Sequence, residues 1–157
     1  AYGKERVEKS DVLDIDSTNK NATIVGDLRD LKHVPNDSYD CIIFTQVFQF
    51  IDDLDAAISE CHRILKKSGT ILATLPSISG VDGTSGIEGD YWRFTEAGTK
   101  YLFKKKFNDE NLTISSVGNV RSGIYSYAGM AEEEISRNVL EKNDRNFPLL
   151  ITVKATK

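Results

Sequence analysis

The segment that most constrains the fold runs over residues 39–76. It begins with YDCIIFT, a nearly continuous apolar run typical of a strand that is covered on both faces. Apolar residues then recur every third or fourth position over residues 54–66, which predicts an amphipathic helix. A second apolar run, at residues 70–75, ends at Pro76. A strand, a helix and a strand joined by short turns predict a parallel pair with a right-handed crossover.

The rest of the chain continues the alternation of strands and helices. Further strands are expected at residues 7–11, 22–25, 112–117 and 149–153, and further helices at residues 96–103, behind the cap residue Thr95, and 131–141. The long excursion between the last two strands predicts an antiparallel pair. Glycine recurs every third residue within residues 77–90 and predicts a mobile loop (Gly80, Gly83, Gly86 and Gly89). We therefore expect one α/β domain over residues 1–157, with a Rossmann-like, mostly parallel sheet and an antiparallel C-terminal strand.

Composition argues against several classes of function. The formal net charge is -4, and no lysine and arginine cluster is interleaved with aromatic residues, so we expect no nucleic-acid partner. No apolar run approaches the ~20 residues of a membrane span. Two cysteines in 157 residues do not form a disulfide framework, which favours a reducing cytoplasm. Cys61 and His62 are neighbours without two further ligands, so no metal is expected.

Polar side chains follow three of the predicted strands. Asp11 and Asp27 lie at or just beyond two strand ends, and Thr45 and Gln46 end a third. In an open parallel sheet, ligands bind at the carboxyl ends of the strands, where a carboxylate can accept hydrogen bonds from both hydroxyls of a ribose. Each acid alone is also typical of a turn or a helix cap. Their occurrence at several strand ends favours a binding site.

Longer segments resemble a known family. VGDLRDL, followed by DSYDCIIFTQVFQFIDDLDAAISECHRILKKSGTILATLP, resembles the central signature of class I S-adenosylmethionine-dependent methyltransferases. That family ends the helix with Arg-x-Leu-Lys-Pro-Gly-Gly, whereas this chain has RILKKSG, so a structural turn differs. DYWRFT, at residues 90–95, is similar to a segment of bacterial methyltransferases linked to glycan and secondary-metabolite pathways. Residues 118–120, 127–134 and 147–155 resemble the C-terminal part of the same subgroup.

The resemblance implies roles for individual residues. Asp11 would hold the ribose hydroxyls of S-adenosylmethionine, with Asp14 and Asp16 as alternatives. Asp27 would accept from the adenine amino group, beside the main-chain amide of Leu28.

The resemblance also implies a methyl-transfer end of the site. Thr45 and Gln46 would lie near the methionine part of the cofactor and its reactive methyl group. Three residues would close over the substrate: Tyr91, Trp92 and Arg93. The alternative is that Trp92 and Phe94 belong to the core and that Arg93 forms a packed ion pair. If the acceptor is a hydroxyl, Asp90 and Tyr91 are the nearest candidates for a general base.

The implied function is S-adenosylmethionine-dependent methyl transfer to a small-molecule or glycan-type acceptor. Only ten residues precede Asp11, and Gly3 is the one glycine among them. We therefore expect the family's first strand and glycine-rich loop to lie upstream, and this truncated chain alone to be inactive. The alternative function is a non-catalytic module that binds a partner. A nicotinamide enzyme is less favoured, because DYWRFT would be unexplained. We also expect a homodimer that covers the exposed sheet edge.

Overall fold

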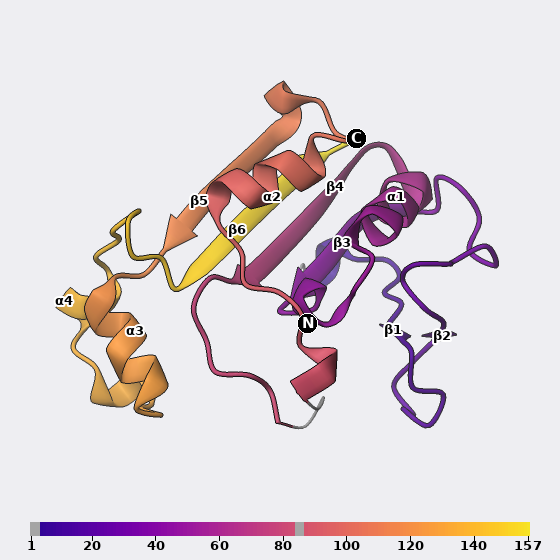
Figure 1. Ribbon diagram of the computed structural model, residues 1–157. Helices are drawn as coiled ribbons and strands as arrows, with labels where there is room; N and C mark the ends of the chain where they lie inside the picture. Colours follow the sequence, from indigo (N-terminus) through magenta and orange to yellow (C-terminus); the bar gives the residue numbers. More distant parts are fainter. Residues whose placement is uncertain (1–3, 84–86) are drawn as a thin grey trace.

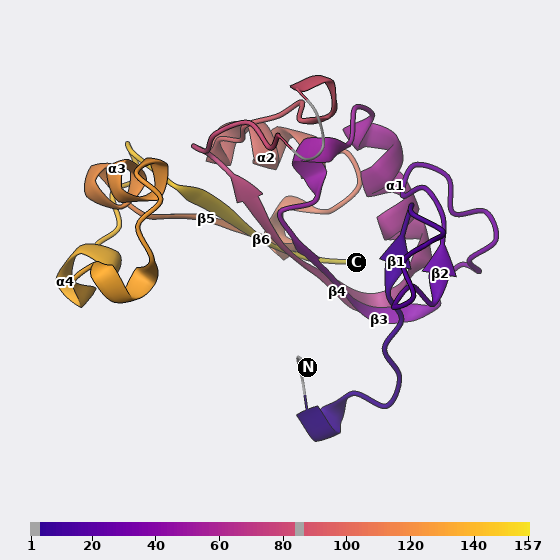
Figure 2. The ribbon, with the colours of Figure 1, turned by 90° about the horizontal axis from the view of Figure 1, so that it is seen from below.

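The computed structural model describes residues 4–83 and 87–157, and its strands form two sheets (Figure 1). The larger sheet has the order β3-β4-β6-β5, in which β3 and β4 are parallel and β6 is antiparallel to both of its neighbours. The smaller sheet pairs β1 with β2 in parallel and lies on the β3 side of the larger one (Figure 2). The strands are β1 (Leu13–Asp14), β2 (Ile24–Val25), β3 (Tyr39–Thr45), β4 (Leu65–Pro76), β5 (Leu112–Val117) and β6 (Leu150–Thr156). Gly3 and Gly86 lie outside the described residues.

The helices α1, α2 and α3 each begin at a side chain that accepts from a free main-chain amide. Asp53 accepts from the amide of Ala56 at the start of α1, and Thr95 does the same for Gly98 at the start of α2. Asn119 and Ser122 form a reciprocal capping box at the start of α3. The α-helices are α1 (Leu54–Ile64), α2 (Glu96–Phe103), α3 (Val120–Tyr127) and α4 (Arg137–Leu140). Short 3-10 turns are η1 (Lys4–Arg6), η2 (Phe48–Phe50), η3 (Ile87–Gly89), η4 (Asp109–Asn111) and η5 (Glu132–Glu134).

The hydrophobic core lies between the larger sheet and the two helices α1 and α2, which cover the same face (Figure 2). Its most deeply buried large side chains are Phe48, Phe103, Leu31, Ile58, Leu65, Ile71, Leu75 and Ile151. No helix in residues 4–83 and 87–157 covers the opposite face. There the paired residues Ile43 and Leu72 remain 44% and 41% exposed. The prediction that the strand at residues 39–45 is covered on both faces is therefore wrong for the described chain.

The first strand lies later than predicted. Residues 7–11 do not form a strand, and Val7 is 44% exposed. The chain enters the small sheet only at Leu13, which pairs with Ile24 and packs against the core. Burial of Leu13 thus decides the register, and it leaves Asp11 two residues before the strand.

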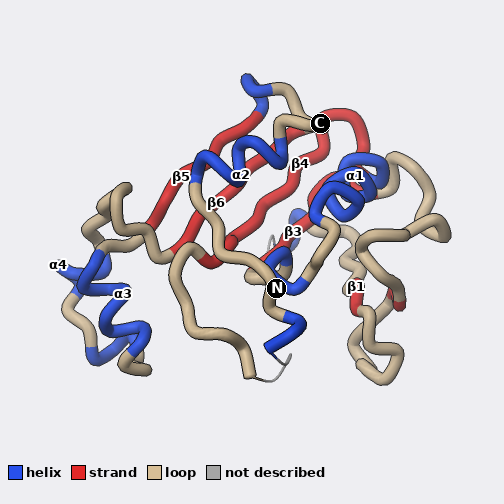
Figure 3. Tube along the Cα trace, in the orientation of Figure 1, coloured by secondary structure: helices blue, strands red, loops and turns tan. Residues whose placement is uncertain are grey.

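The excursion between β5 and β6 also differs from the prediction. A single helix over residues 131–141 is wrong, because Ile135 and Ser136 are extended and separate η5 from α4. The helix α3, which precedes them, was not predicted. Asn119 starts α3 with its side-chain oxygen and donates from Nδ2 to the main-chain oxygens of Val139 and Lys142. One side chain therefore ties α3 to α4, in a lobe at the end of the sheet that is farthest from α1 (Figure 3).

Other sequence predictions are confirmed. The structure has strands at residues 39–45 and 112–117, and a helix at residues 96–103 behind Thr95, within the predicted bounds. The last strand is antiparallel, as expected. The first helix ends at Ile64, two residues earlier than predicted, because Leu65 already begins β4. In the described part of the chain, no helix has the length and apolar character needed to cross a membrane.

Candidate functional site

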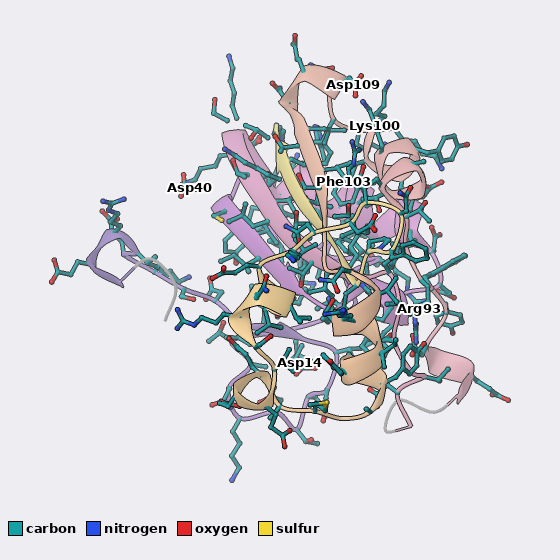
Figure 4. The ribbon with its side chains drawn as sticks, turned by 90° about the vertical axis from the view of Figure 1, so that its left-hand side faces the viewer. Asp14, Asp40, Arg93, Lys100, Phe103 and Asp109 are labelled. Carbon is teal, nitrogen blue, oxygen red and sulfur yellow. The ribbon has the colours of Figure 1, made fainter. Side chains whose placement is uncertain are left out.

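The candidate site lies where β1 to β4 end. Asp14 is the last residue of β1, Asp27 follows β2, and Gln46 follows β3. The segment at residues 90–95 reaches this region at the end of β4, where the amide of Phe94 donates to the Pro76 oxygen over 2.8 Å. Figure 4 shows Asp14 and Arg93 toward one end of the molecule, away from Lys100 and Asp109. Carboxylates and turn residues therefore gather at one edge, the position at which α/β sheets bind ligands.

Asp27 is part of an ionic network that includes Arg29. The main-chain amide of Arg29 donates to Oδ1 of Asp27 over 2.9 Å, and Nη2 donates to Oδ2 over 2.5 Å. Nε of Arg29 lies 3.0 Å from both oxygens. Nη1 of Arg29 reaches Oδ1 of Asp52, also over 2.5 Å. The hydrogen bonds from Arg29 lower the pKa of Asp27 and of Asp52. Asp27 is thus an ionised acceptor, joined through one guanidinium to the segment before α1.

Asp11 lies two residues before β1, whereas Asp14 is its last residue. Asp11 accepts from the hydroxyls of Tyr39 and Thr23, over 3.0 and 3.1 Å, and Tyr39 is the first residue of β3. Asp11 therefore ties the two sheets together on the side away from Gln46, and the structure does not bring it to the carboxyl edge. Asp14 does lie at that edge, where it accepts from the amide of Asp16 and from Nδ2 of Asn19.

A polar turn follows β3. Gln46 has a φ of 58°, and its amide donates to the Thr74 oxygen over 3.0 Å. Gln49 is buried, and its Nε2 donates to the Gln46 oxygen over 2.9 Å. The amide of Tyr91 donates to the main-chain oxygen of Gln49 over 2.8 Å. The structure therefore brings Gln46 and Tyr91 to one turn through Gln49, a residue that the sequence did not single out.

The three residues expected to contact substrate have different environments. Tyr91 is 50% exposed, and Trp92 is 41% exposed while its Nε1 donates to the Ile51 oxygen over 2.8 Å. Arg93 forms a bidentate ion pair with Asp90, whose side chain is only 2% exposed. Arg93 also donates to the main-chain oxygens of Ser79 and Gly80. Arg93 thus forms a packed ion pair and holds the loop after β4. This agrees with the alternative given for Arg93, that of a packed ion pair.

A surface hollow of about 550 Å³ adjoins these residues. Its walls combine carboxylates at the start of α1 with aromatic and apolar side chains of residues 92–102: Asp52, Asp53, Asp55, Trp92, Phe94, Tyr101 and Leu102. Among the described residues no group of three or more His, Cys, Asp and Glu side chains is arranged to hold a metal ion. The hollow can therefore accept polar groups against an aromatic wall.

Arg29 and Gln49 also belong to this edge, and no sequence pattern singled them out. The only sequence signal for Arg29 is its position two residues after Asp27. Gln49 has no local signal at all, because its importance depends on its burial beside Gln46.

The fold and the edge define an α/β protein of the Rossmann-like type, and comparison with known proteins narrows the class. Residues 3–73, somewhat less than half of the chain, match the family described as a methyltransferase domain. None of the curated proteins compared with the sequence matches it. A SAM dependent methyltransferase from Archaeoglobus fulgidus superposes with a TM-score of 0.59 at 17% identity, over 92% of this chain and 74% of that one.

Two further structures are similar. An S-adenosylmethionine dependent methyltransferase from Mesorhizobium loti has a TM-score of 0.55 at 16% identity, over 92% of this chain and 78% of its own. The [4+2]-cyclase SpnF has a TM-score of 0.52 at 16% identity, over 85% of this chain and 55% of its own. The chain therefore has the class I methyltransferase fold. At these identities the similarity shows the fold alone, and the cyclase illustrates that this fold also serves a different reaction.

Proposed function

We propose that the chain carries the S-adenosylmethionine site of a methyltransferase that acts on a small-molecule or glycan-type acceptor. The observation that supports this most is the ionised Asp27 carboxylate after β2, at the carboxyl edge of a class I methyltransferase fold. Adenosine offers an amino group and two hydroxyls as donors, and ionised carboxylates only accept. The chemistry of Asp14 and Asp27 therefore fits the adenosine part of the cofactor.

We assign the roles as follows. Asp27 accepts from the adenine amino group, and the main-chain amide of Leu28 lies beside it. The ribose role predicted for Asp11 is better served by Asp14, because Asp14 ends β1 while Asp11 contacts Tyr39. Thr45 and Gln46 line the methionine end.

When bound, S-adenosylmethionine supplies a methyl group that is already activated by a sulfonium. The protein then needs no nucleophile of its own and contributes by aligning the reactants and excluding water. Tyr91 and Trp92, which are held on the turn after β3, are proposed to contact the acceptor. Arg93 supports them by fixing the loop after β4.

Calorimetric titration with S-adenosylmethionine tests this function, in the longest form of the protein that its coding sequence provides. Asp27→Ala and Asp14→Ala should each weaken binding by about tenfold or more, because each removes a charge-assisted acceptor. Asp11→Ala should weaken it much less. Asp30→Ala, which removes an exposed acid three residues after Asp27, is the matched control. Equal affinity in wild type, Asp27→Ala and Asp14→Ala would exclude the proposed site.

A second candidate function is partner binding through the exposed edge of the larger sheet, with a second copy of the chain as the partner. The apolar strand β3 is an edge strand of the described sheet, and Ile43 and Leu72 are exposed beside each other. An apolar edge strand pairs readily with the same strand of another copy. Light scattering should show a dimer that Ile43→Asp dissociates, whereas Thr113→Asp, on the far edge strand, should not. A monomeric wild type would exclude this pairing.

A further inference from the structure

Arg29 contacts two acids that come from different parts of the chain. It fixes both oxygens of Asp27, two residues before it, and it reaches Asp52, twenty-three residues after it. Asp52 also accepts from the amide of Asp53 over 2.7 Å, and Asp53 caps α1. One planar guanidinium therefore connects the turn after β2 to the start of α1.

The hydrogen bonds from Arg29 to Asp27 limit how many further hydrogen bonds this carboxylate can accept. Each carboxylate oxygen accepts about two hydrogen bonds. Oδ1 of Asp27 accepts from the amide of Arg29 and Oδ2 accepts from Nη2, while Nε of Arg29 lies 3.0 Å from both oxygens and is shared between them. Three donors of Arg29 thus share the carboxylate, which leaves about one acceptor direction, and the guanidinium fork fixes the plane of the carboxylate. Asp27 is thus oriented to accept one more donor.

Stability alone does not account for this arrangement. The side chains of Asp27, Arg29 and Asp52 are 33%, 41% and 51% exposed. Exposed ion pairs contribute little to folding, because water competes for both charges and the ions lose side-chain freedom. Arg29 therefore contributes little to the free energy of unfolding, and its main effect is to fix the orientation of the Asp27 carboxylate.

We propose that Arg29 is a positioning residue: it holds the Asp27 carboxylate in the single orientation in which its remaining acceptor direction meets the bound adenine, and it anchors that orientation at the start of α1 through Asp52. This inference rests on the proposed role of Asp27. Lysine cannot replace Arg29, because one ammonium group cannot span both oxygens of Asp27 and also reach Asp52.

The first experiment measures binding of S-adenosylhomocysteine by calorimetry, with the longest form of the protein. Arg29→Ala should weaken binding by about tenfold, the effect of losing one well-oriented charge-assisted hydrogen bond. Arg29→Lys should not restore it fully. Lys32→Ala is the matched control, because it removes a nearby exposed cation that pairs only with Asp30 among the described residues. The Tm of Arg29→Ala should stay within about 2 °C of wild type.

The pH dependence of binding gives a readout that a purely structural role would not change. Arg29 lowers the pKa of Asp27, so the wild-type carboxylate stays ionised even when the pH falls toward 3.8, the ordinary pKa of an aspartic acid. Without Arg29 the pKa rises, and protonation removes the acceptor at a higher pH. The affinity ratio of wild type to Arg29→Ala should therefore grow as the pH is lowered from 7. A ratio that stays at one throughout would overturn the proposal.

A third measurement needs no ligand and so separates this inference from the proposed function. The Cγ chemical shift of Asp27, followed by NMR as a function of pH, reports the pKa of that carboxyl directly. Arg29→Ala should raise this pKa, and Asp52→Asn should raise it by less, since the fork to Asp27 remains. An unchanged pKa in Arg29→Ala contradicts the positioning role, even if the cofactor binds. A raised Asp27 pKa in Arg29→Ala, in a protein that binds no S-adenosylhomocysteine, supports the positioning of Asp27 by Arg29 and contradicts the proposed function.

Discussion

The side chain of Gln49 donates from Nε2 to the main-chain oxygen of Gln46, 2.9 Å away, and Gln46 is itself left-handed with a φ of 58°. A non-glycine residue in this region is uncommon, and such residues cluster at functional sites, where neighbouring contacts impose the conformation. Here the contacts come from Gln49 and from Thr74, whose main-chain oxygen accepts from the Gln46 amide. The turn therefore depends on the Gln49 side chain and on the main chain of β4, and it ends β3 at the proposed methionine end of the site.

The left-handed conformation of Gln46 predicts that valine destabilises the protein more than glycine at this position, which is the reverse of the order expected at Thr45. Gln46→Val should destabilise the protein by about 1–2 kcal/mol, because a β-branched residue clashes at positive φ, whereas Gln46→Gly should cost little. The neighbouring Thr45 is an exposed strand residue, so there valine should be tolerated and glycine should cost about 0.5–1 kcal/mol. Urea unfolding of the four variants checks this. The same order of stability at both positions would contradict the left-handed turn.

Arg93 should contribute strongly to stability. Arg93→Met leaves the buried Asp90 carboxylate without its cation and removes the hydrogen bonds to the loop after β4, so a loss of about 3 kcal/mol is expected. Arg145→Met is the control, since its ion pair with Glu96 involves an arginine that is 79% exposed. That variant should unfold at nearly the wild-type urea concentration. Similar losses of stability in both variants would show that the Asp90 carboxylate does not depend on Arg93 for its charge compensation.

His62 should make stability depend on pH between neutrality and mild acid. Burial lowers its pKa below 6.5, and the charges of Lys157 and Lys106 lower it further. The unfolded state therefore binds more protons than the folded state just below pH 6.5, so the free energy of unfolding falls as the pH drops through that range. His62→Gln should flatten the profile between pH 7 and the lowered pKa. If wild type and variant have parallel profiles in urea unfolding, the His62 pKa is not lowered.

Gly118 should tolerate no side chain. Its φ is 107°, and an added Cβ would lie 2.6 Å from Cβ of Leu149 and 2.9 Å from its nitrogen. Gly118→Ala should therefore cost more than about 2 kcal/mol. Gly129 has a φ of 72° with no atom near an added Cβ, so Gly129→Ala should cost only about 1 kcal/mol. Thermal unfolding of both variants compares steric contact with backbone strain, and a larger loss at Gly129 would refute the close packing at Leu149.

Local patterns predicted much of the scaffold. The strand at residues 39–45 and the helix behind Thr95 were predicted within their observed bounds, because apolar spacing and a cap residue act over a few neighbours. The same approach placed the first strand at residues 7–11, where the apolar and charged pattern is weak. Only the packing of Leu13 against the core shows that Asp14, and not Asp11, ends that strand.

The sequence by itself determined the order of the main strands and helices, the parallel pair followed by an antiparallel strand, and the acids at strand ends, because each of these follows from side-chain periodicity and turn chemistry. The tertiary structure decided which acids meet and what holds them. Arg29 reaches Asp52, and the amide of Tyr91 reaches the main-chain oxygen of Gln49, only because segments that are far apart in the sequence lie side by side. Contacts of this kind depend on the path of the whole chain, which no local pattern contains.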